Sequence, residues 1–361
     1  MMKYLFIVQG EGRGHMTQAI SLSEMLRSEG HTVVHVLVGK SPRREIPAFF
    51  YEKIMAPVST FDSPNFVVDS KNKKIYIWRS IWINLLMAPT FFRSIAFIRE
   101  KVAETQPDVI VNFYELLGGL YAITSRIKPH IVVVGHQYLL AHPQFVFPKG
   151  YWIDKRLMAI YSWLVAAKAK KKLALSFRPM PDIIRKKLYV VPPLLRSEVR
   201  RLSPQNRGYI LGYLLNAGYA EEIERWHARH PEYELHFFWD KKDAPEDLKV
   251  DDHLWFHRLN DVKFLEMMSK CGGFCTTAGF ESICEAMYLG KPIMMVPTYG
   301  HFEQACNALD ASLAGAGIQN KVFDLDPFVA YLPRHKDVSY AFRQWADSSR
   351  EKFLSLLTHF D

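Results

Sequence analysis

The chain has 361 residues, which is too long for one ordinary hydrophobic core and suits two domains of common size. Hydrophobic residues make up 49% and charged residues 23%, so the composition excludes a disordered chain. The formal charge of +9 favours an anionic partner, and a diphosphate-bearing substrate, an anionic membrane surface and nucleic acid all fit. Nucleic acid fits least, because the basic residues are not interleaved as in a nucleic-acid-binding module.

The first apolar run, Tyr4 to Val8, is too short for a secretory segment and predicts a first strand. No stretch reaches the roughly 18 uncharged apolar residues that a spanning helix needs. The closest stretch lies between Arg79 and Arg93, where Asn84 and Pro89 interrupt it. We therefore expect a cytoplasmic chain that can also lie on the inner face of the membrane as a peripheral protein.

The first half alternates strand and helix patterns. A Gly-rich loop follows the first strand, and Met16–Ser28 predicts a helix that ends before Gly30. Thr32–Val38 predicts a second strand, and Asp108–Asn112 and His130–Val134 are β-branched runs typical of buried parallel strands. This alternation indicates a doubly wound sheet of the α/β class.

The segment Tyr189–Leu195 contains Pro192-Pro193, which cannot continue a helix or a central strand, and it is the predicted interdomain linker. We expect an N-terminal domain over residues 1–190 and a C-terminal domain over residues 191–361. Further strands are expected at Tyr209–Leu214, Tyr233–Trp239, His253–Phe256, Gly272–Thr276 and Pro292–Val296. Helices are expected at about Tyr219–Arg229, Val262–Ser269, Phe280–Leu289, Glu303–Ala314 and Val338–Leu357, the last of which can pack back on the first domain.

Two such units leave a cleft between the carboxyl edges of their sheets, where open α/β sheets bind ligands. Neither a metal nor a cofactor is expected in it. The four cysteines form no C-x-x-C pair and suit reduced thiols in the core, and a metal site is the weaker alternative. Asp324-Leu325-Asp326 is the only D-x-D pattern, and it lies in a loop beyond the residues discussed next.

The strongest pattern in the second half is a strand that ends at a small-residue turn and opens a helix. Free backbone N–H groups and the positive end of the helix dipole at such a turn suit a diphosphate. Downstream acceptor groups suit the hydroxyls of a ribose or a sugar. The residues concerned are Thr277, Ala278, Gly279, Phe280 and Ser282 at the turn, Glu285 one turn later, and Glu303 and Gln304 at the next helix start. Each residue alone has a purely structural explanation, whereas their order and spacing together are more specific.

This segment resembles the donor-binding signature of inverting glycosyltransferases with the GT-B fold, which has two facing Rossmann-like domains. The group includes UDP-glycosyltransferases and the lipid-intermediate N-acetylglucosaminyl transferase. The matching residues are Gly279, Phe280, Ser282, Glu285, Gly290, Pro292, Glu303 and Gln304. The resemblance implies diphosphate binding at residues 277–282, ribose binding by Glu285, and sugar binding by Glu303 and Gln304. It also implies that the C-terminal domain binds the donor and the N-terminal domain the acceptor. Thr277 stands where many members carry a phosphate-binding histidine, which leaves the nucleotide open.

The loop from Gly10 to His15 is a weak Rossmann fingerprint, because its glycines do not give G-x-G-x-x-G. It is similar to the first loop of GT-B enzymes, which implies that Gly12 and Gly14 line the acceptor side and that His15 is the general base. The alternative is that His15 only starts a helix. A carboxylate is needed to orient the ring, and Asp108 and Glu115 are the candidates.

The segment Ile75–Lys101 carries aromatic and basic residues without a recognisable motif. A basic amphipathic helix with Trp78 and Trp82 suits a membrane interface, while the alternative is that its aromatic residues form domain core.

Together these observations predict an inverting transfer of a sugar from a nucleoside diphosphate, UDP by default, to a hydroxyl acceptor, lipid-linked acceptors included. A nucleotide-sugar hydrolase or epimerase of the same fold and a non-catalytic nucleotide-sugar-binding subunit are the alternatives.

Overall fold

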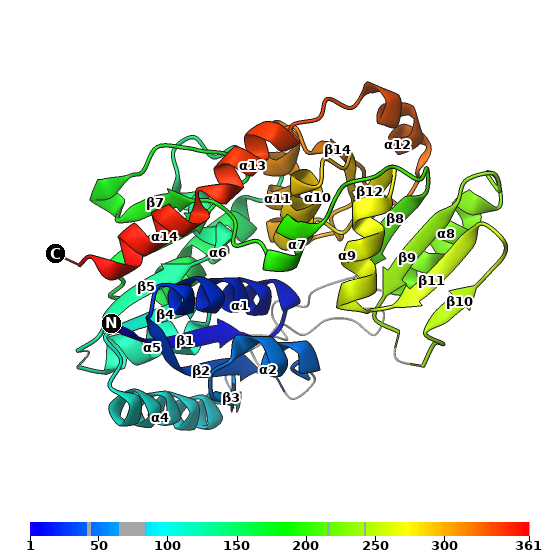
Figure 1. Ribbon diagram of the computed structural model, residues 1–361. Coiled ribbons are helices and arrows are strands. Elements are labelled where there is room, and N and C mark those ends of the chain that lie inside the picture. Colours follow the sequence, from blue (N-terminus) through cyan, green and yellow to red (C-terminus); the bar gives the residue numbers. More distant parts are fainter. Residues whose placement is uncertain are drawn as a thin grey trace.

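The computed structural model describes residues 1–41, 45–64, 84, 86–126, 128–214, 217–241 and 243–360. The described residues form two α/β domains that face each other (Figure 1). This arrangement confirms the predicted α/β class with two Rossmann-like domains.

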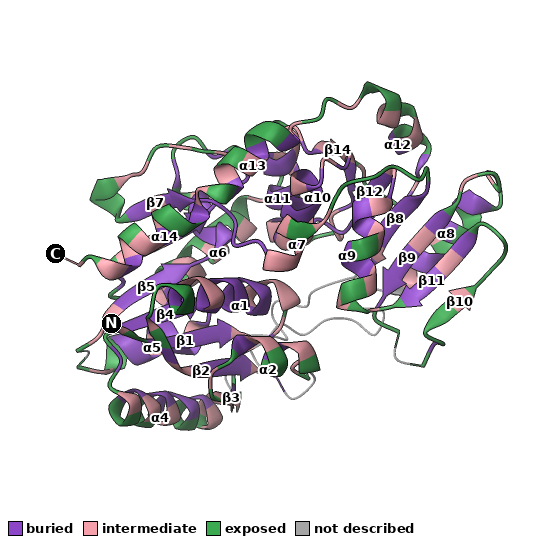
Figure 2. Cartoon of the chain, viewed as in Figure 1, coloured by how far each residue is buried: buried purple, intermediate pink, exposed green. Residues whose placement is uncertain are grey.

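The first domain is built on a seven-stranded sheet in the order β3-β2-β1-β4-β5-β6-β7, and all neighbouring pairs are parallel. Its strands are β1 (Lys3–Gln9), β2 (Thr32–Lys40), β3 (Val58–Asp62), β4 (Val109–Phe113), β5 (His130–Val134), β6 (Lys171–Leu175) and β7 (Leu188–Val191). Its helices are α1 (Arg13–Ser28), α2 (Ala48–Ile54), α4 (Ala88–Thr105), α5 (Leu116–Thr124), α6 (Trp152–Val165) and the 3₁₀ turns η1 (His136–Ala141) and η2 (Ile184–Lys186). The central strands are buried on both faces, as their apolar runs predict (Figure 2).

The second domain has a seven-stranded sheet in the order β10-β11-β9-β8-β12-β13-β14, in which the β10–β11 pair is antiparallel. Its strands are β8 (Ile210–Leu214), β9 (Leu235–Trp239), β10 (Asp247–Lys249), β11 (Leu254–Arg258), β12 (Gly273–Thr276), β13 (Ile293–Met295) and β14 (Gly317–Gln319). Its helices are α7 (Ser197–Arg201), α8 (Ala220–His227), α9 (Asp261–Lys270), α10 (Phe280–Tyr288), α11 (Phe302–Leu313) and α12 (Asp326–Tyr331), with 3₁₀ turns η3 (Ala217–Tyr219) and η4 (Leu332–Arg334).

The expected linker at Tyr189–Leu195 is shorter in the structure, because β7 extends the first sheet to Val191. The β-branched residues before Pro192 continue the strand, and the proline, which has no N–H to donate, ends it. Residues 192–196 then carry the chain into α7.

The expected C-terminal helix is two helices, α13 (Ser339–Asp347) and α14 (Ser349–Thr358), which break at Ser348. They run from the second domain back along the first (Figure 1). There the Nζ of Lys171 donates to the carbonyls of Leu356 and His359 at 2.9 and 2.6 Å. The two domains also share packing, since the Phe177 ring lies 4.6 Å from the Phe280 ring between centroids. They are therefore joined by direct contacts as well as by the linker.

Only part of the segment Ile75–Lys101 is described, and Trp78 and Trp82 lie outside the described residues. In α4, Phe91 is buried with Ile95 and Ile98, whereas Phe92 is 69% exposed. For the described part the core interpretation therefore holds for one face of the helix. Among the described residues, no helix is long and apolar enough to cross a membrane.

Candidate active site between the two domains

The turn after β12 has the backbone geometry of an anion-binding helix start. Ala278 adopts a left-handed conformation, with φ of 62°, which is uncommon for a residue other than glycine. Gly279 is the N-cap of α10 and supplies no capping side chain. Since the first N–H groups of a helix lack intrahelical partners, those of α10 are available to a ligand.

Neighbouring side chains hold this turn in place. The Asn307 amide of α11 donates to the Ala278 carbonyl at 3.0 Å, and Thr277 is buried beneath the turn. The Ser282 hydroxyl donates to the Gly279 carbonyl at 3.2 Å and lies 3.4 Å from the Thr276 hydroxyl. The predicted diphosphate residues thus form one compact turn, as their spacing requires.

Glu285 lies one helical turn into α10 and is paired with an arginine that the sequence analysis did not identify. Nε and a terminal nitrogen of Arg196 donate to the two carboxylate oxygens of Glu285 at 2.6 and 2.8 Å, which is a bidentate pair. The other terminal nitrogen donates to Asp261 at 2.8 Å. Arg196 is 8% and Glu285 2% exposed, so the expected ribose residue is a buried member of an ion pair in this state.

Glu303 and Gln304 open α11 but have different surroundings. Gln304 is buried, and its side-chain oxygen accepts from the Thr298 backbone at 2.8 Å, so it shapes the loop before the helix. Glu303 instead reaches across the domain boundary, where it accepts from the Gln137 amide at 2.9 Å. Of the two expected sugar residues, Glu303 is the one that faces the first domain.

His15 lies in the first turn of α1, whose N-cap, Gly12, supplies no capping side chain. Its Nδ1 is 3.2 Å from the side-chain oxygen of Gln18, one turn further on. The amide nitrogen of Gln18 donates to Glu281 of the second domain at 2.6 Å. Because the Gln18 oxygen is an acceptor, Nδ1 of His15 must carry the proton, which leaves Nε2 as a free base.

The starts of α1 and α10 therefore meet. A Cβ added to Gly14 would lie 3.3 Å from the Cγ of Glu281, so the glycine permits this approach. The ring of His136, from η1, stacks on Phe280 with centroids 4.3 Å apart. The predicted acceptor-side loop and the predicted donor turn are thus neighbours.

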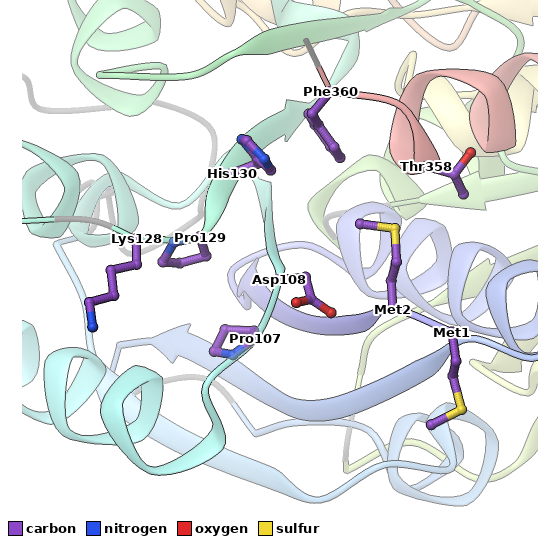
Figure 3. A pocket seen from close by; sticks show the side chains of 9 residues that line it. All are labelled: Met1, Met2, Pro107, Asp108, Lys128, Pro129, His130, Thr358 and Phe360. Atoms are coloured by element: carbon purple, nitrogen blue, oxygen red, sulfur yellow. The ribbon is translucent and has the colours of Figure 1, made fainter.

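The two carboxylates expected to orient His15 lie elsewhere. Asp108 accepts from the Lys3 backbone at 2.7 Å, at the amino ends of β1 and β4, whereas His15 follows the carboxyl end of β1. Asp108 lines a depression of about 530 Å³ together with Met2 and His130, and Figure 3 shows these side chains. The structure does not bring Asp108 to the site.

Glu115 follows the carboxyl end of β4, at the same edge of the sheet as His15, but its hydrogen bonds are made within the first domain. It caps α5 by accepting from the Leu117 N–H at 3.1 Å, and it accepts from the Ser63 hydroxyl at 2.5 Å. The Asn112 side chain accepts from the Glu115 N–H at 2.8 Å and donates to the Glu115 carbonyl at 2.9 Å. Among the described residues, the side chain hydrogen-bonded to His15 is Gln18, so Gln18 takes the orienting position.

Burial sets the protonation of the groups at this boundary. It lowers the pKa of His15, which the charge of Glu303 partly offsets, so the imidazole is neutral at pH 7. Burial raises the pKa of Glu281 to about 8 and that of Glu115 to about 7. Glu281 is therefore largely protonated at pH 7, and its Oε2 is buried without a hydrogen-bond partner among the described residues.

The two facing Rossmann-like domains define a fold of the GT-B type. Solved structures support the fold over nearly the whole chain. The glycotransferase of kitacinnamycin is 16% identical with a TM-score of 0.65, covering 99% of this chain and 98% of that one. Phytolacca americana UGT2, solved with UDP-2fluoro-glucose and pterostilbene, is 13% identical with a TM-score of 0.66, covering 99% of both chains. Spinosyn rhamnosyltransferase SpnG, solved with thymidine diphosphate, is 14% identical with a TM-score of 0.59, covering 99% of this chain and 100% of that one.

Residues 2–333 match the family model described as glycosyl transferase family 1, and the chain belongs to that family. The resemblance drawn from the donor signature is thus confirmed for family and fold. A search of curated proteins finds no match.

Proposed function

We propose that the chain transfers a sugar from a nucleoside diphosphate sugar, with UDP as the default nucleotide, to a hydroxyl of its acceptor with inversion at the anomeric carbon. The observation that carries the proposal is the meeting of two uncapped helix starts, those of α1 and α10, beside a neutral imidazole. A diphosphate suits the N–H groups of α10, and an acceptor hydroxyl suits His15.

In the proposed reaction the acceptor oxygen attacks the anomeric carbon, and the carbon–oxygen bond to the diphosphate breaks. The electron pair of that bond leaves with the nucleoside diphosphate, and the acceptor proton moves to Nε2 of His15. Gln18 keeps the opposite nitrogen protonated through its contact at 3.2 Å. The α10 helix start stabilises the charge on the leaving group, so the proposal needs no metal ion.

Glu281 can lie beside the bound diphosphate because its carboxyl group is protonated. An ionised carboxylate beside a diphosphate would repel it, whereas a pKa of about 8, raised by burial, keeps Glu281 neutral at pH 7. Its Oε2, which has no hydrogen-bond partner among the described residues, can then donate a hydrogen bond to a phosphate oxygen. Glu303 accepts sugar hydroxyls, and Gln304 supports it by fixing the loop before α11.

The ribose role of Glu285 requires that its carboxylate serve two partners. The bidentate pair with Arg196 occupies one lone pair on each oxygen, and a carboxylate offers about four such positions. We propose that the ribose hydroxyls use the remaining positions when the domains separate to admit the donor. We also propose that the acceptor can be lipid-linked and that the protein attaches peripherally to the inner face of a membrane.

The test has two stages. A thermal-shift panel of UDP-, GDP- and dTDP-sugars identifies the donor, because a ligand that binds the native state raises its melting temperature. Product formation with a panel of alcohols, with and without EDTA, then tests transfer, and the anomeric configuration of the product, read by NMR, tests inversion. Nucleotide release that is equally fast without any acceptor would identify a hydrolase, and donor binding without turnover would identify a binding subunit.

A further inference from the structure

The outer face of α6 is apolar and exposed along its whole length. Of its 14 residues only Val165 is buried, although Met158 and Tyr161 also pack inward against the first domain. Its large exposed side chains are Trp152 (66% exposed), Ile153 (49%), Leu157 (44%), Ile160 (58%) and Trp163 (70%). At 3.6 residues per turn and 1.5 Å per residue, these five lie within about 140° of the helix circumference and along about 17 Å of its axis. Single exposed apolar residues are ordinary, whereas a contiguous stripe marks an interaction surface.

The chain segment that contains this helix is rich in basic residues. Between residues 146 and 170 the sequence has five basic residues, namely Lys149, Lys155, Arg156, Lys168 and Lys170, and one acidic residue, Asp154. Arg156 projects from the middle of the apolar arc, with its guanidinium 5.6 Å from the Trp152 ring. Its long side chain can lie along apolar surface while its charge reaches a polar boundary.

The inner face of α6 is held firmly, so the outer face has a fixed orientation. A Cβ on Gly119 of α5 would collide with the Leu164 carbonyl, which shows how closely α5 and α6 approach. The Tyr114 and Ser162 hydroxyls are 2.7 Å apart. The apolar stripe is therefore a stable feature of the fold.

We propose that the outer face of α6 is a docking surface for an anionic lipid bilayer. Tryptophans at both ends of an apolar stripe, with Arg156 beside Trp152 and further basic residues in the flanking sequence, match the interface between acyl chains and headgroups. A second copy of the chain fits less well, because a two-fold interface centred on this face would bring the Arg156 guanidiniums of both copies together in an apolar contact. The inference names the surface for the membrane attachment proposed above and does not depend on the transfer reaction.

Docking by this face would place the candidate active site near the bilayer. The Tyr161 ring on the inner side of α6 is 5.4 Å from the Tyr114 ring, which in turn lies 6.1 Å from the His15 ring. The predicted base is thus two ring contacts away from the helix. An amphiphilic acceptor could keep its tail in the membrane while its hydroxyl reaches His15.

The experiment is vesicle co-sedimentation of the full chain. The vesicles are phosphatidylcholine alone, or phosphatidylcholine with phosphatidylglycerol at a ratio of roughly 7:3, in low and high salt. Binding to the anionic vesicles should weaken with salt, since screening shortens the reach of surface charge to about 10 Å at 0.1 M. The double variant Ile160→Glu, Trp163→Glu should bind roughly a hundredfold more weakly, about tenfold per apolar side chain lost from the interface.

The matched control, Val322→Glu with Tyr340→Glu, makes the same charge change at exposed apolar sites of the second domain, which are 49% and 77% exposed. It should bind like the unmodified chain. Melting temperatures of both double variants should stay close to the original, because all four positions are exposed.

Three outcomes would overturn the proposal. If the unmodified chain fails to bind anionic vesicles at low salt, membrane attachment itself is wrong. If the Ile160→Glu, Trp163→Glu variant binds normally, another surface is responsible. If sedimentation velocity without lipid shows a dimer that this variant dissociates, the face joins two copies of the chain.

Discussion

Replacing Arg196 by methionine tests the buried ion pair that links the segment after β7 to the predicted donor helix. The substitution keeps most of the apolar stem and removes the charge. Glu285, which is 2% exposed, then loses two hydrogen bonds of 2.6 and 2.8 Å and is left without its cation. Removing one partner of a buried pair typically costs about 3–5 kcal/mol. For a domain of this size we expect a fall of about 6–20 °C in melting temperature.

The matched control is Arg200→Met in α7. Arg200 pairs with Asp347, but those side chains are 29% and 50% exposed. A solvent-exposed pair is worth about 0–1 kcal/mol, so the same substitution should cost much less there. Arg200 also donates to the Ala346 carbonyl at 3.0 Å and to the Ser349 hydroxyl at 3.2 Å, so the difference between the two variants is a lower bound on the effect of burying the pair.

The assay is urea unfolding, followed by tryptophan fluorescence, of Arg196→Met, Glu285→Leu and the double variant. Glu285→Leu should cost less than Arg196→Met, because Asp261 still compensates Arg196 at 2.8 Å. The double variant should recover much of the loss, since it leaves no uncompensated charge in the core. The reasoning is refuted if Arg196→Met costs under about 1 kcal/mol, or if the double variant loses the sum of the two single losses.

Three further predictions concern the boundary between the domains. His15→Ala should reduce turnover by about a hundred- to ten-thousandfold and leave donor affinity by calorimetry nearly unchanged, because a general base acts on the acceptor. Donor binding by the unmodified chain should weaken above about pH 8, where Glu281 ionises, and Glu281→Gln should bind equally at pH 7 and pH 9. Glu115 holds its proton more tightly in the folded state, with a pKa of about 7 against 4.5. Unfolding free energy should therefore fall as pH rises from about 4.5 to 7, and Glu115→Gln should remove up to about 3 kcal/mol of that fall.

The alternation of strands and helices and the turn before α10 could be predicted because both depend on residues that are close together in the sequence. β-branched runs, the diproline and the spacing from Gly279 to Glu285 each constrain the backbone within a few residues. The position of Asp108 could also have been predicted from the sequence. It precedes β4 whereas His15 follows β1, and the two strands are parallel, so the two residues must lie at opposite edges of the sheet.

The partners of the site residues were harder to predict, because they depend on tertiary contacts. The contact between Gln18 and His15 could have been predicted, since a residue three positions after His15 lies on the same side of the helix. The pair between Arg196 and Glu285 could not have been predicted, because nothing in the sequence after the diproline shows that the guanidinium folds back onto α10. The α6 stripe has a helical period in the sequence, but periodicity does not tell whether an apolar face points into the core or out to solvent.

The contacts of Gln18 connect the orientation of His15, the proposed base, to the position of the second domain. Its oxygen fixes the tautomer of His15, and its nitrogen is held by Glu281 at 2.6 Å from the start of α10. A donor bound at that helix start would act on the same carboxyl group. The proton on Nδ1 of His15 is thus set by a side chain that is itself positioned from the opposite domain. If His15 is the base, as proposed, this contact orients it when the two domains are together, so we expect proton transfer in the state in which the predicted donor turn and acceptor loop face each other.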